Sequence, residues 1–230
     1  MEKKKIKEFW DNRAKSYNPN NLSVTNLESN AELEKLKVKM EREKLSKIIR
    51  FNKNSVLLDL GCGIGAWSEY FSSNFKKIVG VEYSKEMIKI AIERQKLTEL
   101  ENIEFQLEDS VEFMTETKFD VIFISGLILY LMDSELEIMI KNMNKYSKMG
   151  TQLILREPVG ILGRHEIVNK YSEALKVYYS AIYRTDDEFV AQFRKIGFEL
   201  DFEDFMFPDG SELNKWKETR LKIFSFLKKV

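Results

Sequence analysis

Short apolar runs alternate with amphipathic stretches through the middle of this chain. From Ser55 onward, five runs of strand-forming residues follow one another: SVLLDL, KKIVGVE, NIEFQLE, FDVIFIS and TQLILRE. The stretches between them are polar or amphipathic, the longest being residues 84–97 and 133–146. Strands that alternate with helices form βαβ units, in which the strands are parallel and the crossovers right-handed. We therefore expect an α/β fold built on a parallel sheet.

The flanking segments extend this pattern. A short helix and a loop precede an amphipathic helix in residues 31–50, and a tyrosine-rich segment, residues 158–185, follows the fifth strand. A helix beginning near Asp186 and two strand-like runs, GFELDFEDFMF and TRLKIFSFLK, come last. A length of 230 residues fits one domain. We expect a single domain over residues 1–230, with an N-terminal helical cap (1–50), a core (51–157), an insert (158–185) and a C-terminal helix with two strands (186–230).

Composition argues against several classes of function. Lys plus Arg equals Asp plus Glu at 37 each, so no net charge draws the chain to nucleic acid or to an anionic membrane. One cysteine, Cys62, excludes an internal disulfide, and with one histidine, His165, it argues against a metal site. No run approaches the roughly 20 apolar residues that span a bilayer, and the charged start lacks a signal core. We expect a cytoplasmic protein with no metal, membrane or nucleic-acid partner, while homo- or hetero-oligomers stay open.

Three glycines, Gly61, Gly63 and Gly65, follow the first strand in VLLDLGCGIGAW. They satisfy both the dinucleotide fingerprint G-x-G-x-x-G/A and a G-x-G-x-G turn preceded by an acid. Charge separates the two interpretations, because Asp59 lies at the strand end and no lysine or arginine occurs between it and Lys76. A carboxylate there opposes a pyrophosphate but suits a ligand that carries an ammonium and a sulfonium. S-adenosylmethionine is such a ligand, and we favour it over a nicotinamide dinucleotide.

Acidic residues also end the next two strands. Glu82 ends the second strand about 20 residues beyond the glycines, where an acid can accept both ribose hydroxyls. Asp109 follows the third strand, where its carboxylate can accept a hydrogen bond from an adenine amino group. Strand interiors exclude charge, whereas the carboxyl ends of parallel strands face the ligand crevice. Acids at three successive strand ends therefore indicate a nucleoside site.

These motifs resemble class I S-adenosylmethionine-dependent methyltransferases over residues 55–157, in VLLDLGCGIG, GVEYS, LEDS and FDVIFIS. The resemblance implies a Rossmann-like seven-stranded mixed sheet, with the last strand antiparallel and helices on both faces. We expect the insert to form a helical cap. FWDNRAKSY is similar to the helix before the core in small-molecule members, whose tyrosine covers the methionine end of the cofactor. The cofactor-binding residues expected are Arg13, Tyr17, Asp59, Gly61, Cys62, Gly63, Gly65, Glu82, Tyr83, Asp109, Ser110 and Ser125.

The fourth strand narrows the choice of acceptor. It runs into SGLILY, without the Asn/Asp-Pro-Pro-aromatic loop of enzymes that methylate exocyclic amines of bases, and the only cysteine lies in the glycine loop. A small-molecule acceptor is therefore favoured. LREPVGILGRHE and KYSEALKVYYSAIYRT resemble bacterial methyltransferases of sugar and glycan-precursor pathways, which implies an activated sugar or a phosphorylated surface-polysaccharide precursor. Tyrosines form rigid walls and arginines bind phosphate, so the substrate-binding residues expected are Tyr130, Arg156, Arg164, Tyr178, Tyr179, Tyr183 and Arg184. The alternative is a cap that packs its tyrosines on the sheet.

Methyl transfer from a sulfonium is an in-line displacement, so the enzyme mainly aligns the lone pair of the acceptor with the methyl group. Where a base is needed, the candidates are His165 and Glu157, and Tyr130 can line the pocket or hydrogen-bond the acceptor. Two other hypotheses remain open at this point. One is a nicotinamide-dependent oxidoreductase, and the other is a cofactor-binding, non-catalytic partner subunit of another methyltransferase.

Overall fold

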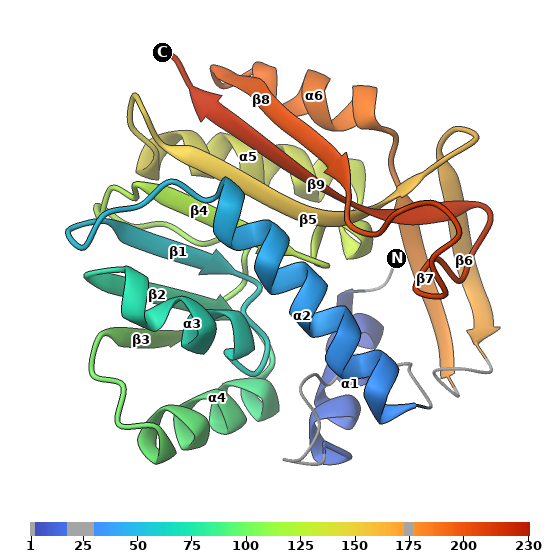
Figure 1. Ribbon diagram of the computed structural model, residues 1–230, viewed down its shortest axis with the longest axis horizontal. Coiled ribbons are helices and arrows are strands. Elements are labelled where there is room, and N and C mark those ends of the chain that lie inside the picture. Colours follow the sequence, from blue (N-terminus) through green and yellow to red (C-terminus); the bar gives the residue numbers. More distant parts are fainter. Residues whose placement is uncertain (1–2, 18–29, 173–176) are drawn as a thin grey trace.

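A computed structural model describes residues 3–17, 30–172 and 177–230 (Figure 1). Six α-helices are present in this part of the chain: α1 Lys3–Lys15, α2 Ala31–Ile48, α3 Ala66–Phe71, α4 Lys85–Leu97, α5 Asp133–Tyr146 and α6 Asp186–Arg194. Two 3-10 turns are η1 Ser72–Asn74 and η2 Ile128–Tyr130. The strands are β1 Val56–Leu60, β2 Lys77–Glu82, β3 Ile103–Leu107, β4 Val121–Ser125, β5 Gln152–Gly160, β6 His165–Ser172, β7 Val177–Tyr183, β8 Phe198–Phe205 and β9 Thr219–Lys228. Among the described residues, no helix has the length and apolar character needed to cross a bilayer.

Seven strands form one sheet in the order β3-β2-β1-β4-β5-β9-β8. The first five pair in parallel, whereas β9 runs antiparallel to both β5 and β8. This is the Rossmann-like mixed sheet, with its last strand antiparallel, that the sequence predicts. The carboxyl ends of the five parallel strands consequently lie along one edge of the sheet, the position that ligands take in open α/β folds.

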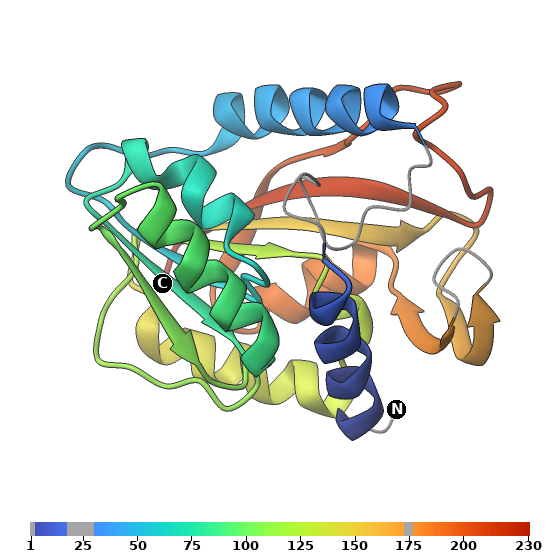
Figure 2. The ribbon, with the colours of Figure 1, turned by 90° about the horizontal axis from the view of Figure 1, so that it is seen from below.

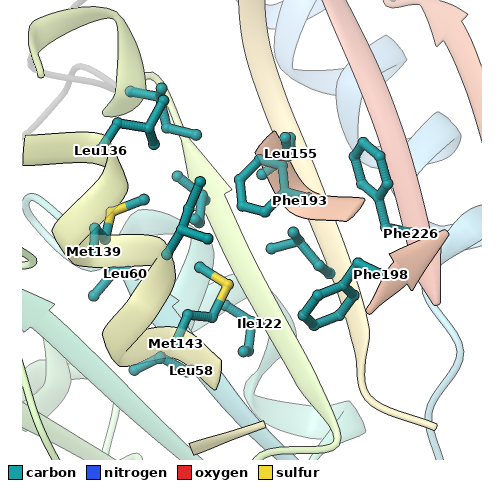
Figure 3. Packing of buried hydrophobic residues seen from close by; sticks show 14 of the residues in the cluster. Leu58, Leu60, Ile122, Leu136, Met139, Met143, Leu155, Phe193, Phe198 and Phe226 are labelled. Carbon is teal, nitrogen blue, oxygen red and sulfur yellow. The ribbon is translucent and has the colours of Figure 1, made fainter. Parts of the chain in front are cut away.

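Alternate residues of the central strands supply two separate cores. Leu58 and Leu60 point to the face covered by α5 and α6, where Met139 and Met143 of α5 pack against them (Figure 3). Leu57, the residue before Leu58, points to the opposite face and belongs to the cluster formed with α2 and α3. This period-2 alternation is what buries a strand on both faces. The sheet is therefore covered by helices on both sides, as predicted (Figure 2).

The insert departs from the sequence-based expectation. Residues 158–185 form no helical cap in the part that the structure describes: β5 continues to Gly160, and β6 and β7 then pair as an antiparallel hairpin beside the main sheet (Figure 1). The prediction of a helix was wrong because the segment is rich in tyrosine and β-branched residues, which fit a pleated surface better than a helix. Cross-strand rings stabilise the pairing, with Tyr171 and Tyr178 5.3 Å apart and His165 and Tyr183 5.8 Å apart between centroids.

Helix α1 is fastened to the start of α4. Ser84 is the N-cap of α4, its side chain accepting from the N–H of Met87 at 3.2 Å. The same hydroxyl donates to Asp11 Oδ1 of α1 at 2.5 Å. Ala14 and Ile64 bury apolar surface beside this contact, together with Met87. The N-terminal helix therefore lies over the loop that follows β1.

Candidate functional site

A cavity of about 930 Å³ lies at the carboxyl ends of β1, β2, β4 and β5. Its walls come from the loop after β1, the residues that follow β2, β3 and β4, and helices α1 and α2. The hairpin β6–β7 and residues 207–221 complete the lining. The cavity therefore occupies the crevice in which doubly wound sheets bind ligands.

The glycine loop presents bare backbone to this cavity. Gly61, Gly63 and Gly65 have φ values of +81°, +55° and +73°, which only glycine adopts at little cost. The N–H groups of Gly61 and Cys62 donate to the carbonyl of Val81 at 2.8 and 3.0 Å, which fixes the loop against β2. Gly61, Cys62 and Gly63 line the cavity. Gly65 does not: it begins α3, and a Cβ there would stand 2.5 Å from the ring of Phe105, so this glycine serves helix–strand packing.

Glu82 connects the glycine loop to the end of β2. Its Oε2 accepts from the N–H of Gly63 at 3.2 Å and its Oε1 from the N–H of Ser84 at 2.9 Å. The side chain is buried yet lines the cavity, and burial raises the pKa of this carboxyl to about 7. Asp109 lines the same wall, with Oδ1 accepting from the N–H of Val111 at 2.9 Å. The structure thus brings the acids from the ends of β2 and β3 together at one cavity.

Three further predicted cofactor residues, Tyr83, Ser110 and Ser125, also line the cavity, as does Arg13 from α1. Asp59 does not, which corrects the expectation that its carboxylate faces the ligand. It is 1% exposed and accepts from Ser68 Oγ of α3 at 2.6 Å, so it fastens that helix behind the loop. Burial raises the pKa of Asp59 to about 6. Its charge can act on a ligand only through the loop and not by contact.

Tyr17 is a second correction at the cofactor end. Its hydroxyl accepts from Arg94 Nη1 of α4 at 2.9 Å, and its side chain packs in the cluster with Ala14 and Met87 instead of lining the cavity. The aromatic residue of α1 that does line the cavity is Trp10, whose ring meets Tyr130 edge to face at 5.4 Å between centroids. The aromatic cover over this end is therefore the indole of Trp10 in α1, about two helical turns before Tyr17 in the chain.

Tyr130 and Arg156 take the expected positions in the cavity wall. Arg156 donates to Ser125 Oγ at 3.1 Å, forms an ion pair with Glu41 of α2, and lies 5.9 Å from the Trp67 ring centroid. Glu41 is almost fully buried, so this pair ties α2 to the carboxyl end of β5. Tyr179, Tyr183 and His165 line the cavity from the hairpin.

Four other predicted residues lie outside the lining. Tyr178 is 66% exposed on the hairpin, because neighbouring strand residues point to opposite faces and Tyr179 faces the cavity. Arg164 pairs at the surface with Asp133, Glu166 and Glu188. Arg184 is 1% exposed and Glu157 is fully buried, and both hydrogen-bond main-chain groups of the turn after β4. Neither side chain is placed to contact a substrate directly.

Several lining residues were not foreseen from the sequence. They are Trp10 of α1, Glu34, Lys37 and Glu41 of α2, Lys170 of β6, and Lys215, Trp216 and Arg220 at the β8–β9 connection and the start of β9. For the lining residues of α1 and α2, the only signal in the sequence is the apolar face of each helix, which predicts the helix but not a site. The β8–β9 connection has no sequence motif that would indicate a binding site. Within residues 3–17, 30–172 and 177–230, no three His, Cys, Asp or Glu side chains are grouped to hold a metal ion.

Comparisons with known proteins agree with this arrangement. A family model described as a methyltransferase domain matches residues 51–218. Phosphoethanolamine N-methyltransferase 1 of Zea mays is 27% identical over 161 residues, covering 68% of this chain and 30% of that protein. Pavine N-methyltransferase of Thalictrum flavum subsp. glaucum is 33% identical over 82 residues, covering 35% of this chain and 23% of that protein. The matched part of this chain thus spans less than a third of the length of either relative.

The same fold occurs in a solved structure. Phosphoethanolamine N-methyltransferase 1 of Haemonchus contortus, in complex with phosphoethanolamine and S-adenosylhomocysteine, superposes with a TM-score of 0.73 at 17% identity. The superposition covers 97% of this chain and 49% of that one. The two chains therefore share an overall fold.

Proposed function

This chain belongs to the family of methyltransferase domains, and we propose on that premise that it transfers the methyl group of S-adenosylmethionine to an oxygen or nitrogen of a small polar molecule. The observation that carries the proposal is the convergence of the glycine loop, Glu82 and Asp109 on one cavity. Gly61 and Gly63 offer backbone without side chains, against which a flat or extended ligand can pack. The likeness to a structure that holds S-adenosylhomocysteine supports this choice of ligand.

The residues present fit the two ends of that cofactor. Glu82 would accept the ribose hydroxyls, and Asp109 and Ser110 would bind near the adenine. Arg13 of α1 supplies a cation for the methionine carboxylate, and Trp10 covers the same wall. The bound cofactor supplies an electrophilic methyl group on a sulfonium. No lysine or arginine lies between Asp59 and Lys76 to receive a pyrophosphate, so this site suits a nicotinamide dinucleotide less well.

The acceptor would carry an anionic group such as a phosphate. Cationic side chains from separate elements line the cavity, namely Arg156 of β5, Lys170 of β6 and Arg220 of β9. Tyr179 and Tyr183 stand among them and can donate to phosphate oxygens. An activated sugar and a phosphorylated precursor both have such a group, and the Haemonchus neighbour was solved with phosphoethanolamine.

A lone pair of the acceptor would form the new bond to the methyl carbon that the cofactor would supply, which would leave the cofactor as a neutral thioether. The acceptor N–H or O–H proton must then leave. His165 lines the cavity, and its imidazole would take this proton as a general base. Tyr130 would align the acceptor from the turn after β4, and the closed aromatic wall would exclude water. Glu157 is not a base for this step, because it is fully buried away from the cavity.

Calorimetry with S-adenosylmethionine and S-adenosylhomocysteine tests the cofactor assignment. Gly63 lines the cavity and a Cβ there meets no atom within 4 Å, so the side chain in Gly63→Arg would enter the space of the ligand. We expect this substitution to weaken binding by about a hundredfold or more. Gly150→Arg is the matched control, since Gly150 also has a positive φ and an open Cβ direction but lies outside the cavity.

Two outcomes would contradict the assignment: no heat of binding with the wild-type protein at about 1 mM ligand, or equal affinity of the Gly63→Arg and Gly150→Arg variants. Release of S-adenosylhomocysteine with a panel of phosphorylated acceptors then separates an enzyme from a non-catalytic partner subunit. Binding without release for every acceptor would favour the partner subunit. Saturable fluorescence of a reduced nicotinamide cofactor would instead favour the oxidoreductase.

A further inference from the structure

The turn that follows β4 forms one wall of the cavity. It comprises residues 126–131, includes η2, and contributes Leu127, Leu129, Tyr130 and Leu131 to the lining. Ile128 of the same turn is fully buried and points into the core under α5. A turn of this kind exposes main-chain N–H groups at one end and carbonyl groups at the other, and when buried they need partners.

Glu157 satisfies the N–H end. Its Oε1 accepts from the N–H of Leu127 at 2.8 Å and from the N–H of Ile128 at 3.1 Å. The carboxyl group comes from β5, the strand next to β4, and is fully buried. A buried carboxyl group, whose pKa is raised to about 7 by burial, therefore holds the beginning of the turn.

Arg184 satisfies the carbonyl end. Its Nη1 donates to the carbonyl of Ile128 at 3.0 Å and its Nη2 to the carbonyl of Leu131 at 2.8 Å. The guanidinium also donates to Asp133 Oδ1, from Nη2 at 2.6 Å and from Nε at 3.1 Å. A cation therefore holds the end of the turn and joins it to the first residue of α5.

Burying a carboxyl group and a guanidinium costs more than burying apolar side chains of similar volume, and the cost is recovered only where the geometry is good and hydrogen bonds are made. Here four hydrogen bonds join the two side chains to the main chain of one short turn. Tyr130 lies in the turn between Ile128, to which Glu157 is hydrogen-bonded, and Leu131, to which Arg184 is hydrogen-bonded. Its side chain lines the cavity and contacts the ring of Trp10. Glu157 and Arg184 are therefore bonded to the main chain on both sides of this tyrosine.

We propose that Glu157 and Arg184 are positioning residues, which together fix the turn after β4 and thereby place Tyr130 for the acceptor. Neither would touch the substrate. Glu157 lies just before the hairpin segment and Arg184 just after β7, and the N–H of Gly160 donates to the carbonyl of Arg184 at 3.1 Å. The base of the hairpin and the turn are thus held as one unit. Only the statement that Tyr130 contacts the methyl acceptor rests on the proposed function.

The test uses the indole ring of Trp10 as a reporter of Tyr130, since the two rings are in contact. The chain has three tryptophans, so the ¹⁵N-labelled protein shows three indole signals in a proton–nitrogen correlation spectrum, assigned with Trp10→Phe and the two equivalent variants. In Glu157→Leu and Arg184→Met we expect the Trp10 signal to shift by more than its linewidth. The signal of Trp216 should stay in place. Arg164→Met is the matched control, because Arg164 also pairs with Asp133 but makes no hydrogen bond to the turn.

Glu157→Gln tests whether the hydrogen bonds of Glu157 or its charge hold the turn, because an amide oxygen can still accept from the N–H groups of Leu127 and Ile128. We expect its Trp10 signal to stay close to that of wild type, and its affinity for S-adenosylhomocysteine to lie within about twofold of wild type. Where an acceptor is known, Glu157→Leu and Arg184→Met should lower kcat or raise KM for the acceptor by about tenfold or more, with cofactor affinity little changed. Glu157→Gln should restore most of this activity.

An unmoved Trp10 signal in Glu157→Leu and in Arg184→Met would overturn the proposal, as would an equal shift in Arg164→Met. If either of those two variants does not fold, Arg184→Lys decides the matter. Its single ammonium cannot reproduce the two-carbonyl contact, so the Trp10 signal must still move. The spectrum needs no ligand, and a failure of the cofactor assignment would leave this test unaffected.

Discussion

Glu82 lies in the proposed cofactor site, and its protonation state should affect binding of the cofactor. Burial raises the pKa of its carboxyl to about 7, so in the unliganded protein it is partly protonated near neutrality. Ribose hydroxyls donate to the ionised form, and binding therefore requires the proton to leave as the pH falls below that value. We expect affinity for S-adenosylhomocysteine to weaken on going from about pH 8 to about pH 6, by at most tenfold per pH unit.

Calorimetry at several pH values with the wild-type protein and Glu82→Gln checks this. The amide cannot ionise, so the variant should bind more weakly at high pH and show a flatter dependence over the range. If its slope equals that of wild type, Glu82 is not the titrating group. Asp59, whose pKa is raised to about 6 by burial, would then be the next residue to test.

The contrast between Glu82 and Asp59 shows what the sequence can predict about single residues. Both were assigned from their place at the end of an apolar run; Glu82 ends β2, and Asp59 is the last residue but one of β1. Which way each carboxylate points depends on a neighbour from another element. The hydroxyl of Ser68 in α3 donates a hydrogen bond to Asp59, which turns this carboxylate away from the cavity. The N–H groups of Gly63 and Ser84 donate to Glu82, which stays at the cavity. The pattern of apolar residues predicts where a strand ends. It does not predict which side chain of another element will hydrogen-bond to the residue at that end.

At the scale of elements, the hydrogen bond between Ser84 and Asp11 joins helix α1 to the start of α4. Because α1 carries Trp10 and Arg13 into the cavity wall, loosening it should weaken the cofactor site without unfolding the sheet. We expect Asp11→Ala to lower affinity for S-adenosylhomocysteine by about fivefold to tenfold, which equals about 1.0–1.4 kcal/mol and lies in the range of one typical intramolecular hydrogen bond. Calorimetry measures this.

Asn12→Ala is the control, since Asn12 lies on the same helix and is exposed. Equal affinities of Asp11→Ala and Asn12→Ala would show that α1 does not depend on the Ser84 contact. A loss of thermal stability in Asp11→Ala as large as that of a core truncation would show that α1 belongs to the cooperative core instead.

Elements with a buried face were predictable, and the hairpin was not. Strands β1 and β4 read as continuous apolar runs because both their faces are covered, and α5 has a clear apolar stripe. Strand β6 is exposed or half-exposed along its whole length, so its sequence HEIVNKYS carries no alternation of apolar and polar residues. Without that signal, tyrosine content alone could not distinguish a helix from a hairpin.

At the scale of the whole molecule, the prediction of one domain implies one cooperative unfolding transition. Phe226 of β9 is fully buried, faces Phe193 of α6 and belongs to the cluster shown in Figure 3. Removing its ring should lower the free energy of unfolding by about 3–5 kcal/mol. In Phe226→Ala, far-ultraviolet circular dichroism and tryptophan fluorescence should both move to a lower midpoint by the same amount.

Separate midpoints for the two probes would show that the N-terminal helices or the hairpin unfold independently of the sheet. Leu97→Ala is the control, because Leu97 is a large apolar residue that is 85% exposed, and its truncation should leave both midpoints nearly unchanged.

The cavity itself is a property of the whole molecule. Its walls come from α1, α2, the glycine loop, the hairpin and residues 207–221, which are far apart in the sequence. The sequence indicated the glycine loop and the acids after it because local motifs encode them. The partner of Arg156, Glu41 of α2, lies 115 residues away, and no local pattern connects the two. Sheet order brings such residues together, so they could be identified only in the folded chain.

Strand β9 lies between β5 and β8, although it is the last of the seven to leave the ribosome. Until residues 219–228 have been translated, the edge of β5 has no neighbour and β8 has nothing to pair with. An unpaired strand edge is a template for strands of other chains. The nascent chain therefore passes through a stage in which its glycine loop has been made but its sheet is still open. We therefore expect a chain truncated before β9 to aggregate and not to fold into a less stable form of the protein.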